Sequence, residues 1–287
     1  MVWLTLALLG AFFTSMTTIL AKIGIKNVNS NFATFVRTGV VIICSLILCI
    51  VTKDITKTSS LKLDNWIFLI LSGLATGCSW LCYYKALKLG NINKVAPIDK
   101  SSFILTSILF IIFFFNATTN NGDLLTILML VLSMLLMLVG TILMIGKQDV
   151  KDASSKAWLI YAILSAVFAA LVALFVKLGL KNIPSNMGTL YRTIVVFIFA
   201  GLIVLFRKDY TGSKSISVKS WVFLILSGIA TGGAWLCEYA ALNYLGSNPI
   251  AVNSISKLSI LLTMFLSFVL LKEKHLYSFY HIQKHNV

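Results

Sequence analysis

A small set of charged side chains lies inside long apolar runs of this 287-residue sequence. Each one costs roughly 2.5 to 3.5 kcal/mol at the centre of a membrane helix, so such residues usually pair, bind an ion or solute, or relay a proton. They are therefore the first candidates for chemistry in this chain. The set comprises Arg37, Lys85, Asp99, Lys100, Arg192, Glu238 and Lys257.

Glu238 and Lys257 are predicted to meet across a helical hairpin. Glu238 lies shortly before the polar segment 244–249 and Lys257 shortly after it. At about 1.5 Å per helical residue, both lie roughly 9 to 12 Å below the same membrane surface. Two interpretations stay open: a static ion pair that offsets the cost of burial, or a pair that opens when solute binds and gates a path past Trp235 and Tyr239.

The other charges allow further interpretations. Lys100 and Lys257 are deep in their runs, which favours a functional or inter-helix role. Arg37 and Arg192 lie about one turn into theirs, so we interpret them as snorkelling to the membrane surface. No carboxylate occurs in the first or sixth apolar run, so a coupling carboxylate would have to be Asp99 or Glu238.

Motifs for other chemistries are absent from the sequence. It has no HExxH, no Gly-x-Ser-x-Gly, no paired carboxylates at working spacing and no GxxxxGK[ST]. Its five cysteines lie in apolar runs without CxxC spacing, and the three histidines of the tail form no metal-binding pattern. We expect no enzyme activity, catalytic residue, cofactor or bound metal.

The composition indicates an integral membrane protein. Hydrophobic residues make up 59% of the chain, charged residues 11%, and the mean hydropathy is +0.94. The 24 Lys and Arg residues exceed the 9 Asp and Glu residues, but they flank apolar runs and form no basic block. We expect the lipid bilayer and a small-molecule solute as partners, and no nucleic acid. The opening MVWLTLALLGAFF is expected to be a first span and not a removable signal.

Nine apolar runs approach or exceed the roughly 20 residues that a membrane helix needs. No alternating barrel pattern occurs, so the predicted fold is all-α. The predicted spans are 3–21, 33–52, 66–87, 95–115, 124–146, 158–176, 188–206, 221–243 and 250–271.

The chain contains an internal repeat. Residues 66–87 (WIFLILSGLATGCSWLCYYKAL) match 221–242 (WVFLILSGIATGGAWLCEYAAL) at 16 of 22 positions, and 21–38 match 176–193 at the same offset. We predict a first repeat at 1–147, a linker at 148–157, a second repeat at 158–274 and a polar tail at 275–287. Because five spans per repeat is an odd number, the second repeat must be inverted.

The motifs NSNFAT-x-x-RT, ILSGLATG-x-SWLCYYKAL and APIDKSS resemble those of EamA-type proteins in the drug/metabolite transporter superfamily. The resemblance implies a ten-helix transporter of the cell membrane with a solute path between its halves. We expect alternating-access transport of a small metabolite or amphiphilic solute. A lipid-carrier flippase subunit, or a membrane protein that does not transport, remains an alternative.

The second repeat departs from that pattern at its end. We expect the tenth helix to be absent and so predict nine helices, and Pro97 and Asp99 have no equivalents in the second copy. An uncovered face on the ninth helix favours a homo-oligomer or low stability in detergent.

Each third span repeats one helical face of glycines and aromatic residues. The glycines form GxxxG and are predicted to pack helices closely, whereas the aromatic residues line a cavity or an interfacial belt. The glycines are Gly73, Gly77, Gly228 and Gly232; the aromatic residues are Trp80, Tyr84, Trp235 and Tyr239.

The first span carries a hydroxyl cluster that the sixth span replaces with Ala and Val. These side chains either form one wall of the solute path or bond back to their own helix. The cluster comprises Thr14, Ser15, Thr17 and Thr18.

The sequence gives two answers for orientation. Lys and Arg are more numerous in the odd-numbered predicted loops and the tail, which places the N-terminus outside. The family resemblance implies an N-terminus inside.

Overall fold

A computed structural model of the chain describes residues 2–24, 28–89, 95, 98–99, 101–119, 122–145, 157–210 and 216–271. Within these ranges the protein is helical and contains no strand. The predicted all-α membrane architecture is therefore confirmed. Residues 148–156 of the predicted linker 148–157, the tail 275–287 and Lys100 lie outside the described residues, so the predicted domain boundaries stay predictions.

Among the described residues, six helices are long and apolar enough to cross a membrane. Runs of about 20 apolar residues satisfy their own backbone hydrogen bonds only as helices when no water is present. These six are α1 (Val2–Gly24), α2 (Ser30–Val51), α3 (Leu63–Leu89), α8 (Ala157–Gly179), α9 (Ser185–Arg207) and α10 (Val218–Asn243).

The remaining described helices do not meet the same requirement of length and apolar character. Shorter apolar stretches cover Ser102–Phe113, Leu124–Gly140 and Pro249–Thr263. The elements are the 3₁₀ helix η1 (Asp54–Ser60), α5 (Ser102–Phe113), α6 (Phe115–Thr119), α7 (Leu124–Ile145), α11 (Pro249–Lys257) and α12 (Ser259–Leu271).

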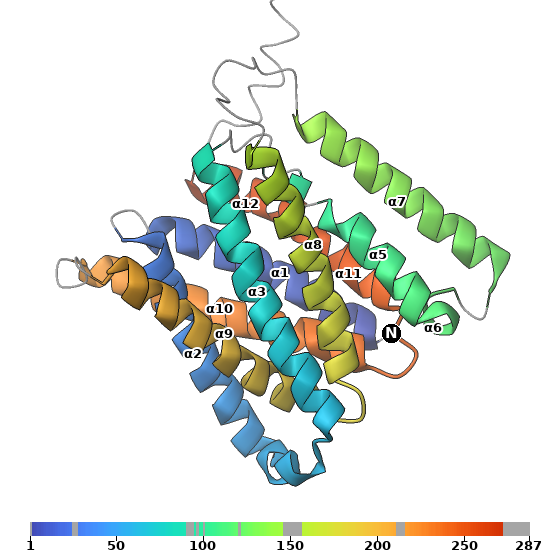
Figure 1. Cartoon of the computed structure of the whole chain (residues 1–287), viewed down its shortest axis with the longest axis horizontal. Helices are drawn as coiled ribbons and strands as arrows, with labels where there is room; N and C mark the ends of the chain where they lie inside the picture. The colour runs from blue at the N-terminus through green and yellow to red at the C-terminus, as the bar shows by residue number, and fades with distance from the viewer. Residues whose placement is uncertain are drawn as a thin grey trace, which may run out of the picture.

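Helices of the two halves pack against each other in matched pairs. In Figure 1, α3 lies beside α8 and α9 beside α2, while α1 packs along α10. Since α1 corresponds to α8 and α3 to α10 in the repeat, the α1–α10 and α3–α8 contacts are equivalent. The two halves thus interlock, and the protein core lies along the surface between them.

The predicted span 250–271 is not one helix. It divides into α11 and α12 at Leu258, whose N–H donates to Ile255 and so tightens the chain into a 3₁₀ turn. Ser101, at the matching place in the first half, makes the same turn by donating to the carbonyl of Ile98. Both turns directly follow the lysine positions 100 and 257.

The helix α7 lies at the edge of the molecule. Its main contacts among the described helices are with α5 and α6, and Figure 1 shows it set apart from the central bundle. Large apolar side chains along it, such as Leu128, Leu132 and Leu136, are exposed in the isolated chain. In a membrane this face is covered by lipid or by another protein.

Glycines set the close approach of α3 to α9 and of α10 to α2. A Cβ built on Gly73 would be 2.7 Å from Val195, and one on Gly228 would be 2.7 Å from Val40. Both glycines also lie next to the backbone carbonyl of an arginine, Arg192 and Arg37 respectively. The glycine faces therefore hold the two arginine-bearing helices against the other half.

Candidate functional site

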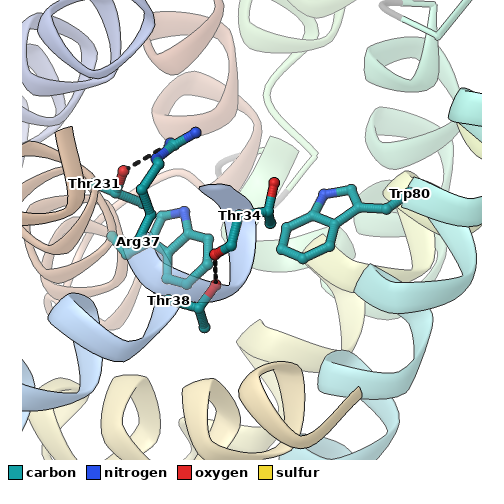
Figure 2. Close-up of a pocket in the computed structure, with 6 residues that line it drawn as sticks. Thr34, Arg37, Thr38, Trp80 and Thr231 are labelled. Atoms are coloured by element: carbon teal, nitrogen blue, oxygen red, sulfur yellow. Dashed lines mark hydrogen bonds between the residues drawn. The ribbon is translucent and has the colours of Figure 1, made fainter. Parts of the chain in front are cut away.

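Two cavities lie where the halves meet, and each is built around one arginine. The Arg37 cavity has a volume of about 170 Å³ and draws its lining from α2, α3 and α10. Figure 2 shows Arg37 reaching toward Thr231 while Trp80 faces Thr34 across the space. The lining comprises Thr34, Arg37, Thr38, Trp80, Thr231 and Trp235.

The second, which we call the Arg192 cavity, has a volume of about 160 Å³. Its walls come from α5, α8, α9, α10 and α11, so both halves contribute. Trp235 lines both cavities. Either space is large enough for several water molecules or one small solute.

Arg192 is placed deep inside the protein. Only 2% of its surface is exposed, and its Nη2 donates to the hydroxyl of Thr76 at 2.7 Å. Its guanidinium carbon lies 4.7 Å from the ring centre of Trp235 and 5.5 Å from that of Tyr239. The snorkelling interpretation is wrong for Arg192, because Thr76 and the two rings hold the side chain inward.

Arg37 also points into the protein. Its Nη2 donates to the Thr231 hydroxyl at 3.0 Å, the same bond that Arg192 makes with Thr76 in the other half. Snorkelling does not describe this side chain either. The sequence contained a signal for both arginines, since each begins a matched Arg-Thr pair in the repeat.

Glu238 and Lys257 both line the Arg192 cavity. The Glu238 carboxylate accepts a hydrogen bond from Ser256, and the charges of Lys257 and Arg192 act on it. The hairpin between α10 and α11 thus brings the two predicted partners to one cavity. Whether their interaction opens during a transport cycle stays a prediction.

The predicted aromatic residues are divided between the two cavities. Trp80 lines the Arg37 cavity, and Tyr239 is buried in the wall of the Arg192 cavity. The side chain of Tyr84 lies outside the described residues.

Asp99 does not line either cavity. It accepts a hydrogen bond from Ser165 of α8 at 2.7 Å, and Ser165 in turn lies 3.3 Å from the hydroxyl of Ser79 on α3. Ser165 is one helical turn before Ala169, which does line the Arg192 cavity. Asp99 therefore joins the two halves beside the cavity.

The hydroxyl cluster of α1 is mostly satisfied within its own helix. Thr14, Ser15 and Thr18 donate to carbonyls three or four residues earlier. Only the Thr17 hydroxyl reaches another helix in the described contacts, lying 3.4 Å from that of Thr231. Thr17 is thus next to the Arg37 cavity, whereas back-bonding explains the other three.

At each end of the α2–α9 pair, asparagine side chains of one half donate hydrogen bonds to an aspartate of the other half. We call these two clusters clamps, and the sequence analysis did not predict them. In the Asp209 clamp, Asn29 and Asn31 before and within α2 donate to the carboxylate of Asp209, which follows α9. In the Asp54 clamp, Asn186 at the start of α9 donates to Asp54, which follows α2, at 3.0 Å.

This exchange of ends shows that α2 and α9 run antiparallel. The signal was visible in the sequence, since an Asn-rich segment and a Lys-Asp pair recur at the same offset. Lys53 and Lys208 adopt the same left-handed conformation, with φ of 57° and 54°, and this turns each following aspartate toward the other half.

The Asp54 clamp has additional donors. Thr52 and Lys57 also donate to its carboxylate, at 2.7 and 3.0 Å. Burial would raise the pKa of the Asp54 carboxyl, but the hydrogen bonds from Thr52, Lys57 and Asn186 outweigh it and keep the pKa below its usual value.

The chemistry that this arrangement supports is recognition of a solute. Cations, hydrogen-bond donors and aromatic rings surround a small space between the halves. Among the described residues, no three His, Cys, Asp or Glu side chains come together as metal ligands. The three histidines lie in the tail, outside those residues.

Comparison with known proteins points to transport. A sequence model of the EamA-like transporter family matches residues 1–139 and 156–278. Over 106 residues the chain is 44% identical to a Sinorhizobium protein named as an uncharacterized transporter in the cobO 3′ region. That alignment covers 37% of this chain and 75% of the relative.

Proposed function

The chain belongs to the EamA-like transporter family, and from this premise we propose that it carries a small metabolite or amphiphilic solute by alternating access. It is a multi-pass membrane protein, and we assign it to the cell membrane. The Arg192 cavity is the proposed solute site. The observation that carries this proposal is a charged cavity enclosed by helices of both halves.

The clamps supply the proposed gates. One clamp lies at each end of the antiparallel α2–α9 pair, and each joins residues of both halves. A solute can enter from one side only if the helices separate at that end. Closing the opposite clamp at the same time keeps the path sealed, which is the requirement of alternating access.

Transport is tested first in vesicles. Purified protein is reconstituted, and uptake of a panel of radiolabelled small metabolites is compared with that of empty vesicles. We expect saturable uptake of at least one class of solute. Vesicles that never exceed the empty control across the panel would contradict a transporter function.

The mechanism is tested by locking each clamp. In a background without the native cysteines that still transports, the pairs Asp54→Cys with Asn186→Cys and Asp209→Cys with Asn31→Cys are oxidised separately. We expect either cross-link to stop transport and a reductant to restore it. Single-cysteine variants treated alike are the controls. Continued transport with a clamp cross-linked would contradict alternating access at these gates.

A further inference from the structure

The charged groups that line the Arg192 cavity do not balance. Among its lining residues, Arg192 and Lys257 are cationic and only Glu238 is anionic. The carboxylate of Glu238 already interacts with Lys257, Arg192 and Ser256. These lining residues therefore carry a net charge of one positive unit, and inside a protein such a charge attracts an anion more strongly than in water.

Arg192 also has hydrogen-bond donors without an acceptor among the described residues. Among the residues that the structure describes, its Nε and Nη1 have no hydrogen-bond acceptor, although the side chain is 98% buried (2% exposed). The rings of Trp235 and Tyr239 contact the guanidinium through their faces, which gives cation–π attraction but no acceptor. Leaving such donors empty in a protein interior is costly.

A second residue that lines the same cavity also has a donor without an acceptor among the described residues. Asn253 on α11 is 7% exposed, and its Nδ2 has no partner among the described residues. Two helices from the second half thus present empty donors to one space. A ligand with acceptor oxygens would satisfy both.

One part of the cavity lining is apolar. It is formed by one face of α8 and by Phe110 of α5, so a ligand must place a hydrocarbon body there. The apolar residues of α8 are Ala169, Val172, Ala173 and Val176.

We propose that the Arg192 cavity binds a small amphiphilic monocarboxylate, with the carboxylate at Arg192 and the hydrocarbon body against α8. This proposal rests on the transport function above and names its substrate class. A monoanion matches the net positive charge of Arg192, Lys257 and Glu238 together, whereas a phosphate monoester carries about −1.5 to −2 at neutral pH. An organic cation would face two positive groups.

Binding is measured by calorimetry on the full chain in lipid nanodiscs. Pentanoate and benzoate are compared with pentanamide and benzamide, which keep the shape but lose the charge, and with pentylamine and phenyl phosphate. We expect both carboxylates to bind at least about tenfold more tightly than each other probe. Equal affinity, a preference for amine or phosphate, or no binding by any probe would overturn the proposal.

Variants test whether Arg192 is the residue that binds the carboxylate. Arg192→Gln is expected to abolish the preference for carboxylate over amide, and the exposed Arg207→Gln at the end of the same helix is the matched control. If Arg192→Gln fails to fold, Thr76→Val keeps the guanidinium but removes its anchor and should weaken carboxylate binding several-fold. Folding is followed by gel filtration and circular dichroism. A preference that survives in a folded Arg192→Gln variant would overturn the assignment.

The two proposals fail differently. If carboxylates bind but do not cross reconstituted vesicles, the substrate assignment stands and the transport function fails. If the vesicles carry amines or neutral solutes and exclude carboxylates, transport stands and the assignment to Arg192 fails.

Discussion

Arg37 and Arg192 stand 155 residues apart in the repeat, yet their surroundings differ. Both donate to the matching threonine of the opposite half, Thr231 and Thr76. Arg37 is half-buried beside hydroxyl groups, whereas Arg192 is almost fully buried beside two aromatic rings and a carboxylate.

The difference comes from a few residues around each arginine, whereas the arginine–threonine hydrogen bond itself is the same in both halves. Thr17 of α1 lies near the first arginine's threonine, and its counterpart Val172 lines the Arg192 cavity. Tyr83 of the first half corresponds to Glu238 of the second. Duplication thus supplied two equivalent arginine positions, and substitution around one of them produced a charged amphiphilic cavity.

The largest effect on stability is expected from the difference between Glu238 and its counterpart Tyr83. Glu238→Gln leaves Lys257 and Arg192 without a carboxylate in the cavity, so we expect a loss of about 3 kcal/mol in the free energy of unfolding. Tyr83→Phe, at the matching position, removes no charge and should cost about 1 kcal/mol or less. Thermal unfolding in detergent measures both.

The double variant completes this test. Glu238→Gln with Lys257→Met removes both charges, and we expect it to recover most of the stability without recovering transport. A Glu238→Gln protein as stable as the wild type would show that the two halves do not differ here. It would also contradict an energetic role for the pair.

The glycine faces offer a second comparison, with a smaller expected effect. A Cβ built on Gly77 would be 2.2 Å from the Phe199 ring, but one on Gly232 would be 3.4 Å from Cys44. We expect Gly77→Ala to cost about 2 kcal/mol through overpacking, and Gly232→Ala less than about 0.5 kcal/mol. Unfolding in matched detergent measures the difference.

A rescue variant identifies the cause of that difference. Adding Phe199→Leu to Gly77→Ala should return part of the lost stability, because the smaller side chain leaves room for the new methyl group. If the two alanine variants are equally stable, the closer packing around Gly77 has no energetic consequence.

Much of the fold could be predicted from the sequence, because membrane helices must be long and apolar and because repeats are visible directly. The all-helical fold and the transporter family are confirmed. The division of 250–271 could not be predicted, since Leu258 is a good helix former and the turn there arises from a single shifted hydrogen bond.

The site was predicted only in part. Glu238 and Lys257 could be placed together because helix rise fixes depth below the surface. Arg192 was misjudged because depth alone does not say which way a side chain faces, and Thr76 lies 116 residues away. The clamps were missed because Asn and Asp near helix ends are also common caps.

The two clamps allow a third comparison, with modest effects because they lie near the surface. Asp209 accepts from Asn29 and Asn31, whereas Asp54 accepts from Asn186, Thr52 and Lys57. Loss of one amide therefore leaves Asp209 with fewer donors.

We expect Asn31→Ala to cost about 1 kcal/mol and Asn186→Ala about 0.5 kcal/mol. Thermal unfolding of the two variants measures the difference. The reverse order would show that Thr52 and Lys57 do not support Asp54.

The smallest expected effect is the pH response of the Asp54 clamp. The pKa of Asp54 is below its usual value because hydrogen bonds outweigh burial. A carboxyl whose folded pKa is depressed stabilises the protein fully above the unfolded pKa, about 3.9, and loses this as pH falls through the folded pKa. The gap in melting temperature between wild type and Asp54→Asn should therefore persist at pH 6, and it should narrow as the pH falls from about 3.9 through the folded pKa of Asp54. Asn186→Ala removes one of the donors to Asp54, so the folded pKa of Asp54 is depressed less in this variant. The gap in melting temperature between Asn186→Ala and Asp54→Asn should therefore close at a higher pH. A gap that does not change with pH would mean that the ionised carboxylate does not hold this end of the α2–α9 pair.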